Sequence, residues 1–174
     1  SEERLAVTLS SIGDAVIATG VEGDVALMNP VAEQLTGWTR AEAYGRDSQA
    51  VFNIVNEKTG RRVESPVEKI LRLGTIVGLA NHTILISKNG MKIPIDDSGA
   101  PIRDDKGNLL GVVLIFRDVT ERRKNQKALK EYSERLEEMV ASRTKELRDA
   151  QKELVRQERL AVLGQLTATV AHEI

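Results

Sequence analysis

The sequence predicts an α+β protein: a five-stranded antiparallel sheet with helices inserted between its second and third strands, followed by one long C-terminal helix. All four prolines precede Ile102, and neither glycine nor proline occurs between Gly111 and Gly164. These two residues are the strongest breakers of regular structure, so their absence predicts a continuous helix. Before that region, short apolar runs alternate with turn sequences, as expected of hairpins.

Composition restricts the function classes. The 174 residues are 41% hydrophobic and 29% charged, which is typical of a folded domain with an extension and not of a disordered chain. A net charge of −1 provides no field for nucleic acid or an anionic membrane, so we expect neither partner for this segment. The absence of cysteine excludes disulfides, thiolate catalysis and Cys-ligated zinc. No signal peptide or apolar run of about 20 residues is present.

The first hairpin and the inserted helices follow from local signals. Apolar runs at 14–18 and 25–28 flank a Gly-rich turn. Three helix starts come next, each with a capping residue followed by a proline or a glutamate. They are Asn29-Pro30 before a helix at 31–35, Thr39 with Glu42, and Ser65-Pro66 with Glu68 before a helix that Gly74 stops.

Three further strands complete the sheet. The candidates are 79–87, 91–102 and 109–116. Turn sequences at 88–90 and 104–108, both containing Asn and Gly, join them as hairpins. Each hairpin pairs consecutive strands antiparallel, so the predicted order is β-β-α-α-α-β-β-β.

The long helix is predicted to begin at residues 118–121, where Asp118 and Glu121 have the spacing of a capping box. An apolar stripe follows it, with a stutter from Tyr132 to Val140 that locally unwinds a left-handed coiled coil. A new stripe begins at Leu160 beside small residues, a pattern typical of a four-helix bundle. We therefore expect a parallel homodimeric coiled coil. The alternative is a solvated single helix.

Several stretches resemble the PAS family of sensor domains. Residues 25–33 resemble its second strand and the turn into its first helix, and Leu35-Thr36-Gly37-Trp38 with Glu42 and Gly45 resembles the segment that follows. Residues 88–90 resemble the loop before the fourth strand, and 111–123 resemble the last strand with its Asp-Ile-Thr exit motif. The resemblance implies a PAS-like sensor domain with a pocket that could hold a small-molecule ligand.

Residues 158–174 resemble the H-box of bacterial sensor histidine kinases, the enzymes of two-component systems. By position, the resemblance implies that His172 is the phosphoacceptor and that Glu173 is the general base or orienting group. It also implies ATP and Mg²⁺ in the full-length kinase and a response-regulator receiver domain as partner. The ATP-binding domain is not in this chain, so the chain alone should be inactive.

Helical geometry predicts that His172 is exposed. It lies two residues from both Val170 and Ile174, which is about 200° around the helix from the apolar stripe at ~100° per residue. An imidazole has an ordinary pKa of ~6.5, so much of it is the free base near neutral pH. Glu173 could accept a hydrogen bond from one nitrogen and leave the other as the nucleophile.

Signal relay is assigned to Asp118, Thr120 and Arg122 in the exit motif. In related PAS domains the exit-motif aspartate pairs with a nearby basic residue, and Arg122, four residues on, is the natural partner in a helix start. A helix cap alone is the alternative for Asp118. Either way, a change in the sheet would reach the helix at this residue.

No cofactor or metal site is predicted in this chain. In PAS domains that bind haem, the histidine ligand usually lies on the helix before the third strand, here Pro66 to Leu73. His82 falls early in the third strand instead, so haem is not expected to bind through it. A hydrogen-bonded structural role suits it better. The reactive cysteine of the family's flavin photosensors is absent from this chain, and few aromatic rings are available to stack on a planar cofactor. Asp96 and Asp97 are adjacent on a strand and point to opposite faces, so they cannot converge on a cation, and a solvated or pocket-rim role is expected.

The predicted organisation is an incoming helix at 1–12, a PAS-like sensor domain at 13–118, a coiled-coil signalling helix at 119–157, and the start of the histidine-phosphotransfer helix at 158–174. The chain looks cut from a longer protein, soluble or membrane-anchored, of which this segment is cytoplasmic. The predicted function is sensing and dimerisation in a histidine kinase. One rival is a PAS dimerisation or protein-interaction module with a non-kinase output, and another is a cofactor-binding redox or gas sensor.

Overall fold

A computed structural model describes residues 13–78 and 82–173 of the chain. The chain divides into two units, Ser1–Arg123 and Lys124–Ile174, which are described separately. The predicted incoming helix at 1–12 lies outside the described residues, as does Ile174.

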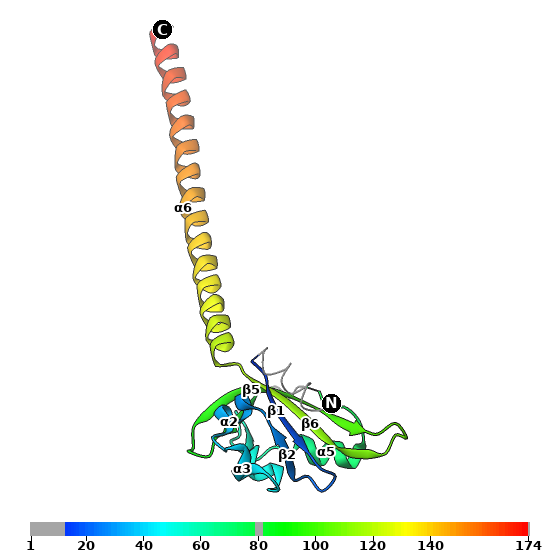
Figure 1. Cartoon of the computed structure of the whole chain (residues 1–174). Helices are drawn as coiled ribbons and strands as arrows, with labels where there is room; N and C mark the ends of the chain where they lie inside the picture. Colours follow the sequence, from blue (N-terminus) through cyan, green and yellow to red (C-terminus); the bar gives the residue numbers. More distant parts are fainter. Residues whose placement is uncertain (1–12, 79–81, 174) are drawn as a thin grey trace. The chain divides into compact units, whose positions relative to one another are not determined.

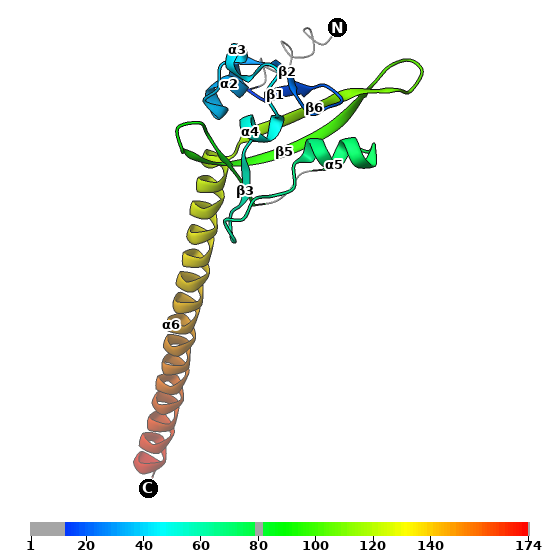
Figure 2. The same ribbon diagram turned by 90° about the horizontal axis from the view of Figure 1, so that it is seen from below.

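The first unit is built on a six-stranded antiparallel sheet with strand order β2-β1-β6-β5-β4-β3 (Figure 1). The strands are β1 (Ala15–Thr19), β2 (Val25–Met28), β3 (Ile54–Asn56), β4 (Thr83–Ile86), β5 (Lys92–Arg103) and β6 (Leu109–Asp118). Between β2 and β4 lie α2 (Pro30–Thr36), α3 (Arg40–Ala43), α4 (Ser48–Val51) and α5 (Pro66–Leu73). The turned view in Figure 2 shows α5 beside the long β5 strand, which it contacts.

The predicted strand count of five is wrong by one. The additional strand, β3, has three residues and pairs with β4 at the sheet edge, with Ile54 opposite Leu85. A run of three residues is too short to show alternation between apolar and polar positions, so the sequence gives no signal for it. The four-residue helix α4 is also not predicted, because its cap, Asp47, is followed by neither the proline nor the glutamate that marks the three predicted helix starts.

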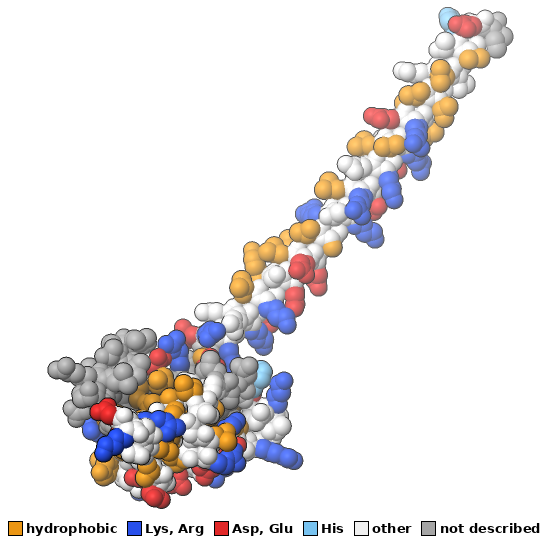
Figure 3. All heavy atoms as spheres, turned by 90° about the vertical axis from the view of Figure 1, so that its right-hand side faces the viewer, with side chains coloured by type: hydrophobic (Ala, Val, Ile, Leu, Met, Phe, Trp, Pro, Cys, Tyr) orange, Lys and Arg blue, Asp and Glu red, His pale blue; other side chains and the backbone are white. Residues whose placement is uncertain are grey.

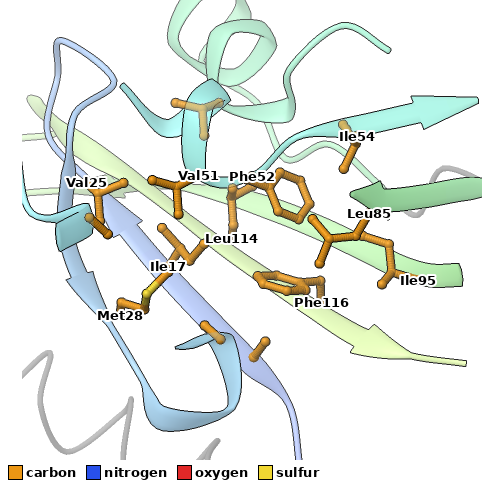
Figure 4. Close-up of a cluster of buried hydrophobic side chains, with 14 of the residues drawn as sticks. Ile17, Val25, Met28, Val51, Phe52, Ile54, Leu85, Ile95, Leu114 and Phe116 are labelled. Carbon is orange, nitrogen blue, oxygen red and sulfur yellow. The ribbon is translucent and has the colours of Figure 1, made fainter. Parts of the chain in front are cut away.

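A single apolar core lies between the sheet and the inserted helices. Phe52 and Phe116 stand at its centre with ring centroids 4.8 Å apart, and Figure 4 shows Leu85 and Ile95 beside Phe116. Gly99 belongs to the same face, where an added Cβ would lie 2.5 Å from Cδ1 of Ile70. The inward positions of β5 therefore carry either apolar side chains or no side chain, with one exception described below.

Two of the three predicted helix caps are confirmed. Oδ1 of Asn29 accepts from the backbone N–H of Ala32, and Thr39 forms a reciprocal capping box with Glu42. The third start is in place, but Ser65 makes no side-chain cap hydrogen bond. Glu68, expected to complete that box, instead accepts from the side-chain amide of Gln49.

The predicted hairpin turns are also found. Gly90 and Gly107 have φ angles of 84° and 81°, in the left-handed region that favours glycine. In the second turn Asp104 accepts hydrogen bonds from the backbone and side chain of Asn108 and from the backbone of Lys106. These bonds, the backbone N–H of Asn108 first, hold the pKa of Asp104 below its ordinary value.

The second unit is a single helix. Helix α6 (Thr120–Glu173) has 54 residues and begins in the exit segment of the first unit, which confirms the predicted unbroken helix. None of its described side chains is buried, and apolar side chains are exposed along its length (Figure 3). No helix within the described residues is both long enough and apolar enough to cross a membrane.

Candidate functional site

The exit segment, residues 117–123, joins β6 to α6. Its geometry starts with Asp118, whose Oδ1 accepts hydrogen bonds from the backbone N–H of Thr120 at 2.8 Å and from its hydroxyl at 2.5 Å. The backbone N–H of Val119 donates to the carbonyl of Pro94 on β5 at 3.0 Å. The chain is thus held to the sheet one residue before α6 begins, and Asp118 satisfies the first free N–H of the helix, as a capping residue does.

Arg122 does not pair with Asp118, so the predicted pairing is wrong. Its Nη1 lies 3.4 Å from Oδ2 of Asp96 on β5. Oδ1 of Asp118 accepts the backbone N–H and the hydroxyl of Thr120. Strand pairing places Asp96 of β5 opposite Arg117 of the exit segment, and so within reach of Arg122. Of the three proposed relay residues, Asp118 and Thr120 are therefore in contact with each other, and Arg122 binds elsewhere.

Arg123 forms a second anchor, meaning a contact between an arginine of the exit segment and an acidic residue elsewhere in the first unit. The sequence did not predict it. Its Nη1 donates to Oε2 of Glu57 at 2.9 Å, and Nδ1 of His82 lies 3.3 Å from the same oxygen. The backbone N–H of Glu57 also donates to the carbonyl of His82. Partial burial raises the pKa of Glu57, but the charge of Arg123 and hydrogen bonds from His82 and Arg123 outweigh it, so the pKa is lowered overall.

His82 itself is hydrogen-bonded, as expected, but lies just before β4 and not within the strand. Its φ is 65°, the one positive value among the described non-glycine residues. Such a conformation is unusual for a residue with a Cβ, and it places the imidazole beside Glu57.

Arg117 completes the set of anchors. Its Nε donates to Oδ1 of Asp14, just before β1, at 2.6 Å. The hydrogen bond and the charge of Asp14 raise the pKa of Arg117. The three arginines of the exit segment thus bind three acids on different parts of the sheet, Asp14, Asp96 and Glu57. These partners are 103, 26 and 66 residues away, so no local spacing could reveal them.

Asp97 is the exception on the inward face of β5. Adjacent strand residues do point to opposite faces, as expected, but Asp97 is not solvated: it is 2% exposed and lies opposite Phe116. Its Oδ1 has no hydrogen-bond partner among the described residues. Burial, with a further contribution from the negative charge of Asp96, raises the pKa of Asp97 to about 6. It is the sole buried ionisable side chain in the parts of the chain that the structure describes.

His172 and Glu173 lie in the last turn of α6, and both side chains are exposed. They belong to the second unit, Lys124–Ile174. An exposed imidazole on a helix surface can be approached by another domain, and Glu173, its neighbour in sequence, brings a carboxylate to the same helical turn. Within residues 13–78 and 82–173, no group of three or more His, Asp or Glu side chains could hold a metal ion.

Comparison with known proteins identifies the first unit. Residues 9–124 match the PAS fold family. Among solved structures, a PAS domain from Colwellia psychrerythraea aligns with a TM-score of 0.53 and 19% identity over 68% of this chain and 97% of that one. The PAS domain of nitrogen regulation protein NR(II) from Vibrio parahaemolyticus aligns with a TM-score of 0.51 and 12% identity over 65% of this chain and 95% of that one. At these identities the likeness establishes the fold alone.

Curated relatives are signalling proteins of more than one kind. Probable diguanylate cyclase DgcE from Escherichia coli K12 is 33% identical over 123 residues, 71% of this chain and 11% of that protein. Signal transduction histidine-protein kinase AtoS from the same strain is 30% identical over 169 residues, 95% of this chain and 22% of that protein. Cyclic di-GMP phosphodiesterase PdeB from Shewanella oneidensis MR-1 is 31% identical over 121 residues, 69% of this chain.

The chain therefore spans less than a quarter of the length of each of these relatives. What they share with it is a sensory and signalling domain. The fold, the strand order and the match over residues 9–124 together show that the chain belongs to the PAS family, with a long helix following the domain.

Proposed function

We propose that this chain is the sensing and dimerisation segment of a two-component sensor histidine kinase in which His172 accepts phosphate from ATP. The observation that carries the proposal is the extent of the match to AtoS. Its 169 aligned residues extend well beyond the PAS region at 9–124 and therefore into the helix that contains the H-box-like residues. The diguanylate cyclase and phosphodiesterase matches, at 123 and 121 residues, are no longer than a PAS domain requires.

The proposed chemistry at His172 needs few groups from this chain. The neutral imidazole attacks the γ-phosphorus of ATP, the bond to the β–γ bridging oxygen breaks as the N–P bond forms, and ADP leaves. Glu173 accepts a hydrogen bond from the other ring nitrogen and orients the ring. Metal and nucleotide come with the ATP-binding domain, and the phosphoryl group then passes to an aspartate of a response-regulator receiver domain. Exposure of both side chains supports this assignment, because a bulky donor domain must reach the imidazole.

The exposed apolar side chains of α6 support the same proposal. The helix is 54 residues long and buries no described side chain, although leucine, valine and tyrosine recur along it at three-, four- and seven-residue steps. An isolated helix of this kind gains nothing from those apolar side chains, whereas a second copy in parallel register would bury them. The proposed assembly is a homodimer whose PAS domains act on one parallel coiled coil.

In this proposal the exit segment is the relay. A ligand or partner that changes the sheet would shift the anchors at Asp118, Thr120 and Arg122 and so the twist or register of the paired helices. The proposed setting is a cytoplasmic segment, and the stimulus would be read in the interior of the PAS domain.

The second candidate is a PAS module that controls a different output, as the diguanylate cyclase and phosphodiesterase relatives favour. In that case the helix would connect the sensor to a nucleotide-handling domain, and His172 would have no chemical role. The two candidates differ in what happens to this one imidazole.

The deciding experiment compares His172→Gln with His82→Gln in the full-length parent protein, incubated with radiolabelled ATP and Mg²⁺. The chain has two histidines, so the second substitution is a matched control. We expect acid-labile, base-stable label in the wild type and loss of label in His172→Gln. His82 contacts Glu57 in the sensor unit, so His82→Gln can change the rate of labelling but should keep label of the same kind. Undiminished labelling of His172→Gln would exclude the kinase assignment, and turnover of GTP or cyclic di-GMP by the parent would favour the alternative.

A further inference from the structure

Asp97 is a buried carboxyl group whose surroundings would suit an apolar side chain. Its neighbours on the inward face of β5 are Ile95 and Gly99, and Phe116 lies opposite on β6. Ile95 and Phe116 are completely or almost completely buried, and the buried residues of α5 nearby are Pro66, Val67 and Ile70. No described residue donates a hydrogen bond to Oδ1 of Asp97.

An ionised carboxylate in such surroundings is unfavourable, because Oδ1 is buried without a donor and no Lys or Arg among the described residues forms an ion pair with Asp97. The neutral acid avoids that penalty. On its own strand, Asp96 is on the opposite face and adds negative charge. On β6, Arg117 lies across from Asp96 and is paired with Asp14. The buried residues of α5, and Thr83 and Leu85 on the inward face of β4, carry no charge.

Residues 94–97 of β5 also contact the start of α6. Asp96 binds Arg122, and the carbonyl of Pro94 accepts from the N–H of Val119. The stretch 94–97 therefore faces the core through Ile95 and Asp97 and holds the exit segment through Pro94 and Asp96. A rearrangement that hydrates an ionised Asp97 must move this stretch, and with it both contacts to the helix start.

We propose that Asp97 is a proton-binding site inside the PAS domain, and that loss of its proton loosens the contacts of β5 with the first turn of α6. The ligand is a single proton, which converts the carboxylate to the neutral acid. The proton site itself depends on the PAS unit alone. Its consequence for phosphorylation at His172 rests on the proposed kinase function.

The pH range over which Asp97 loses its proton follows from the direction of its pKa shift. Burial raises the pKa of Asp97 to about 6 in the folded domain, above the ordinary value of 3.8. The folded state then binds the proton more tightly than the unfolded state, so this stabilising contribution is complete below pH 3.8 and is lost as pH rises through about 6. Between pH 5 and pH 7 the ionised fraction of Asp97 rises from about one tenth to about nine tenths.

The test uses residues 1–174 with ¹³C-labelled aspartate. The carboxyl resonance of Asp97, assigned through the backbone and by its absence in Asp97→Asn, is expected to titrate near pH 6. Asp104, exposed and hydrogen-bonded to Asn108, is the internal reference and should titrate below its ordinary value. An Asp97 resonance that titrates at or below 3.8 would overturn the proposal, and the wild-type titration gives this result even if the variant fails to fold.

Hydrogen exchange provides the second measurement, on the same chain and without any kinase assay. Corrected for intrinsic rates, protection of the Val119 and Arg123 amides, which donate to the carbonyls of Pro94 and Val119, is expected to fall about tenfold between pH 5 and pH 7.5, the change that one pKa unit of coupling corresponds to. Asp97→Asn, which stays neutral, should remove this pH dependence. If the resonance titrates near 6 while protection of these two amides stays constant, the proposed coupling to α6 is wrong. Neither result depends on whether His172 is phosphorylated.

Discussion

Arg123, in the first turn of α6, donates to Oε2 of Glu57 at 2.9 Å across a sequence separation of 66 residues. Glu57 follows β3 at the far edge of the sheet and also contacts His82 through both side chain and backbone. Together with Arg122 and Asp96, this contact ties the helix start to two separate parts of the sheet. A movement at either place would therefore displace the same helical turn.

Charge reversal tests this contact. We expect Glu57→Arg and Arg123→Glu each to cost about 1 kcal/mol of unfolding free energy, because each places like charges together in a partly exposed pair. The double variant restores opposite charges and should recover most of that loss. Urea denaturation of residues 1–174 gives the three values and their coupling free energy.

The control for charge reversal is the pair Arg72–Glu64, 2.7 Å apart and more exposed than Arg123. Reversing Glu64 should leave hydrogen exchange of the Val119 and Arg123 amides unchanged, whereas Glu57→Arg should accelerate it. Equal exchange in these two variants would show that the Glu57–Arg123 pair does not hold the first turn.

Gly111 tests the close approach of β1 and β6. A Cβ at this position would lie 1.9 Å from the carbonyl oxygen of Thr19, a backbone atom that cannot move without disturbing the strand. Gly111→Ala is therefore expected to destabilise the domain by about 3 kcal/mol, at the upper end for overpacking. At Gly78 the added Cβ meets nothing within 4 Å, so Gly78→Ala should change stability little. Similar thermal denaturation of both variants would contradict this packing argument.

How far the sequence predicted the structure depended on how local each signal was. The helix caps at Asn29 and Thr39 were predictable because capping residue and recipient N–H are three residues apart. The burial of Asp97 was not, because period-two alternation tells which residues share a face but not which face is covered. The pairing of Arg122 with Asp96 was equally hidden, since it depends on strand register and not on helical spacing.

Association through α6 can be tested with a single substitution on its apolar stripe. Leu147 is 67% exposed in the single helix and would be buried in the proposed coiled coil. Leu147→Lys removes about 1.5–3 kcal/mol of burial free energy from each copy of the helix. It should therefore raise the dimer dissociation constant at least about tenfold. Asp149→Lys introduces the same side chain about 200° around the helix and is the matched control. Sedimentation equilibrium distinguishes them, and equal association of both variants would argue against this stripe as the dimer seam.

Double-mutant cycles can separate the two contacts at the exit segment, Asp118 with Thr120 and Asp96 with Arg122. Asp118→Ala removes the acceptor for the N–H of Thr120 and should cost about 1 kcal/mol, as the loss of a helix cap does, whereas Asp118→Asn keeps an acceptor and should cost less. Asp118 and Arg122 bind different partners, so Asp118→Ala and Arg122→Ala should be additive within about 0.3 kcal/mol. Asp96→Ala and Arg122→Ala share one contact, 3.4 Å long and largely exposed, and should show a coupling of about 0.5 kcal/mol. Coupling in the first cycle and none in the second would mean that Arg122 pairs with Asp118 after all, and that the helix start is held from within its own turn and not by β5.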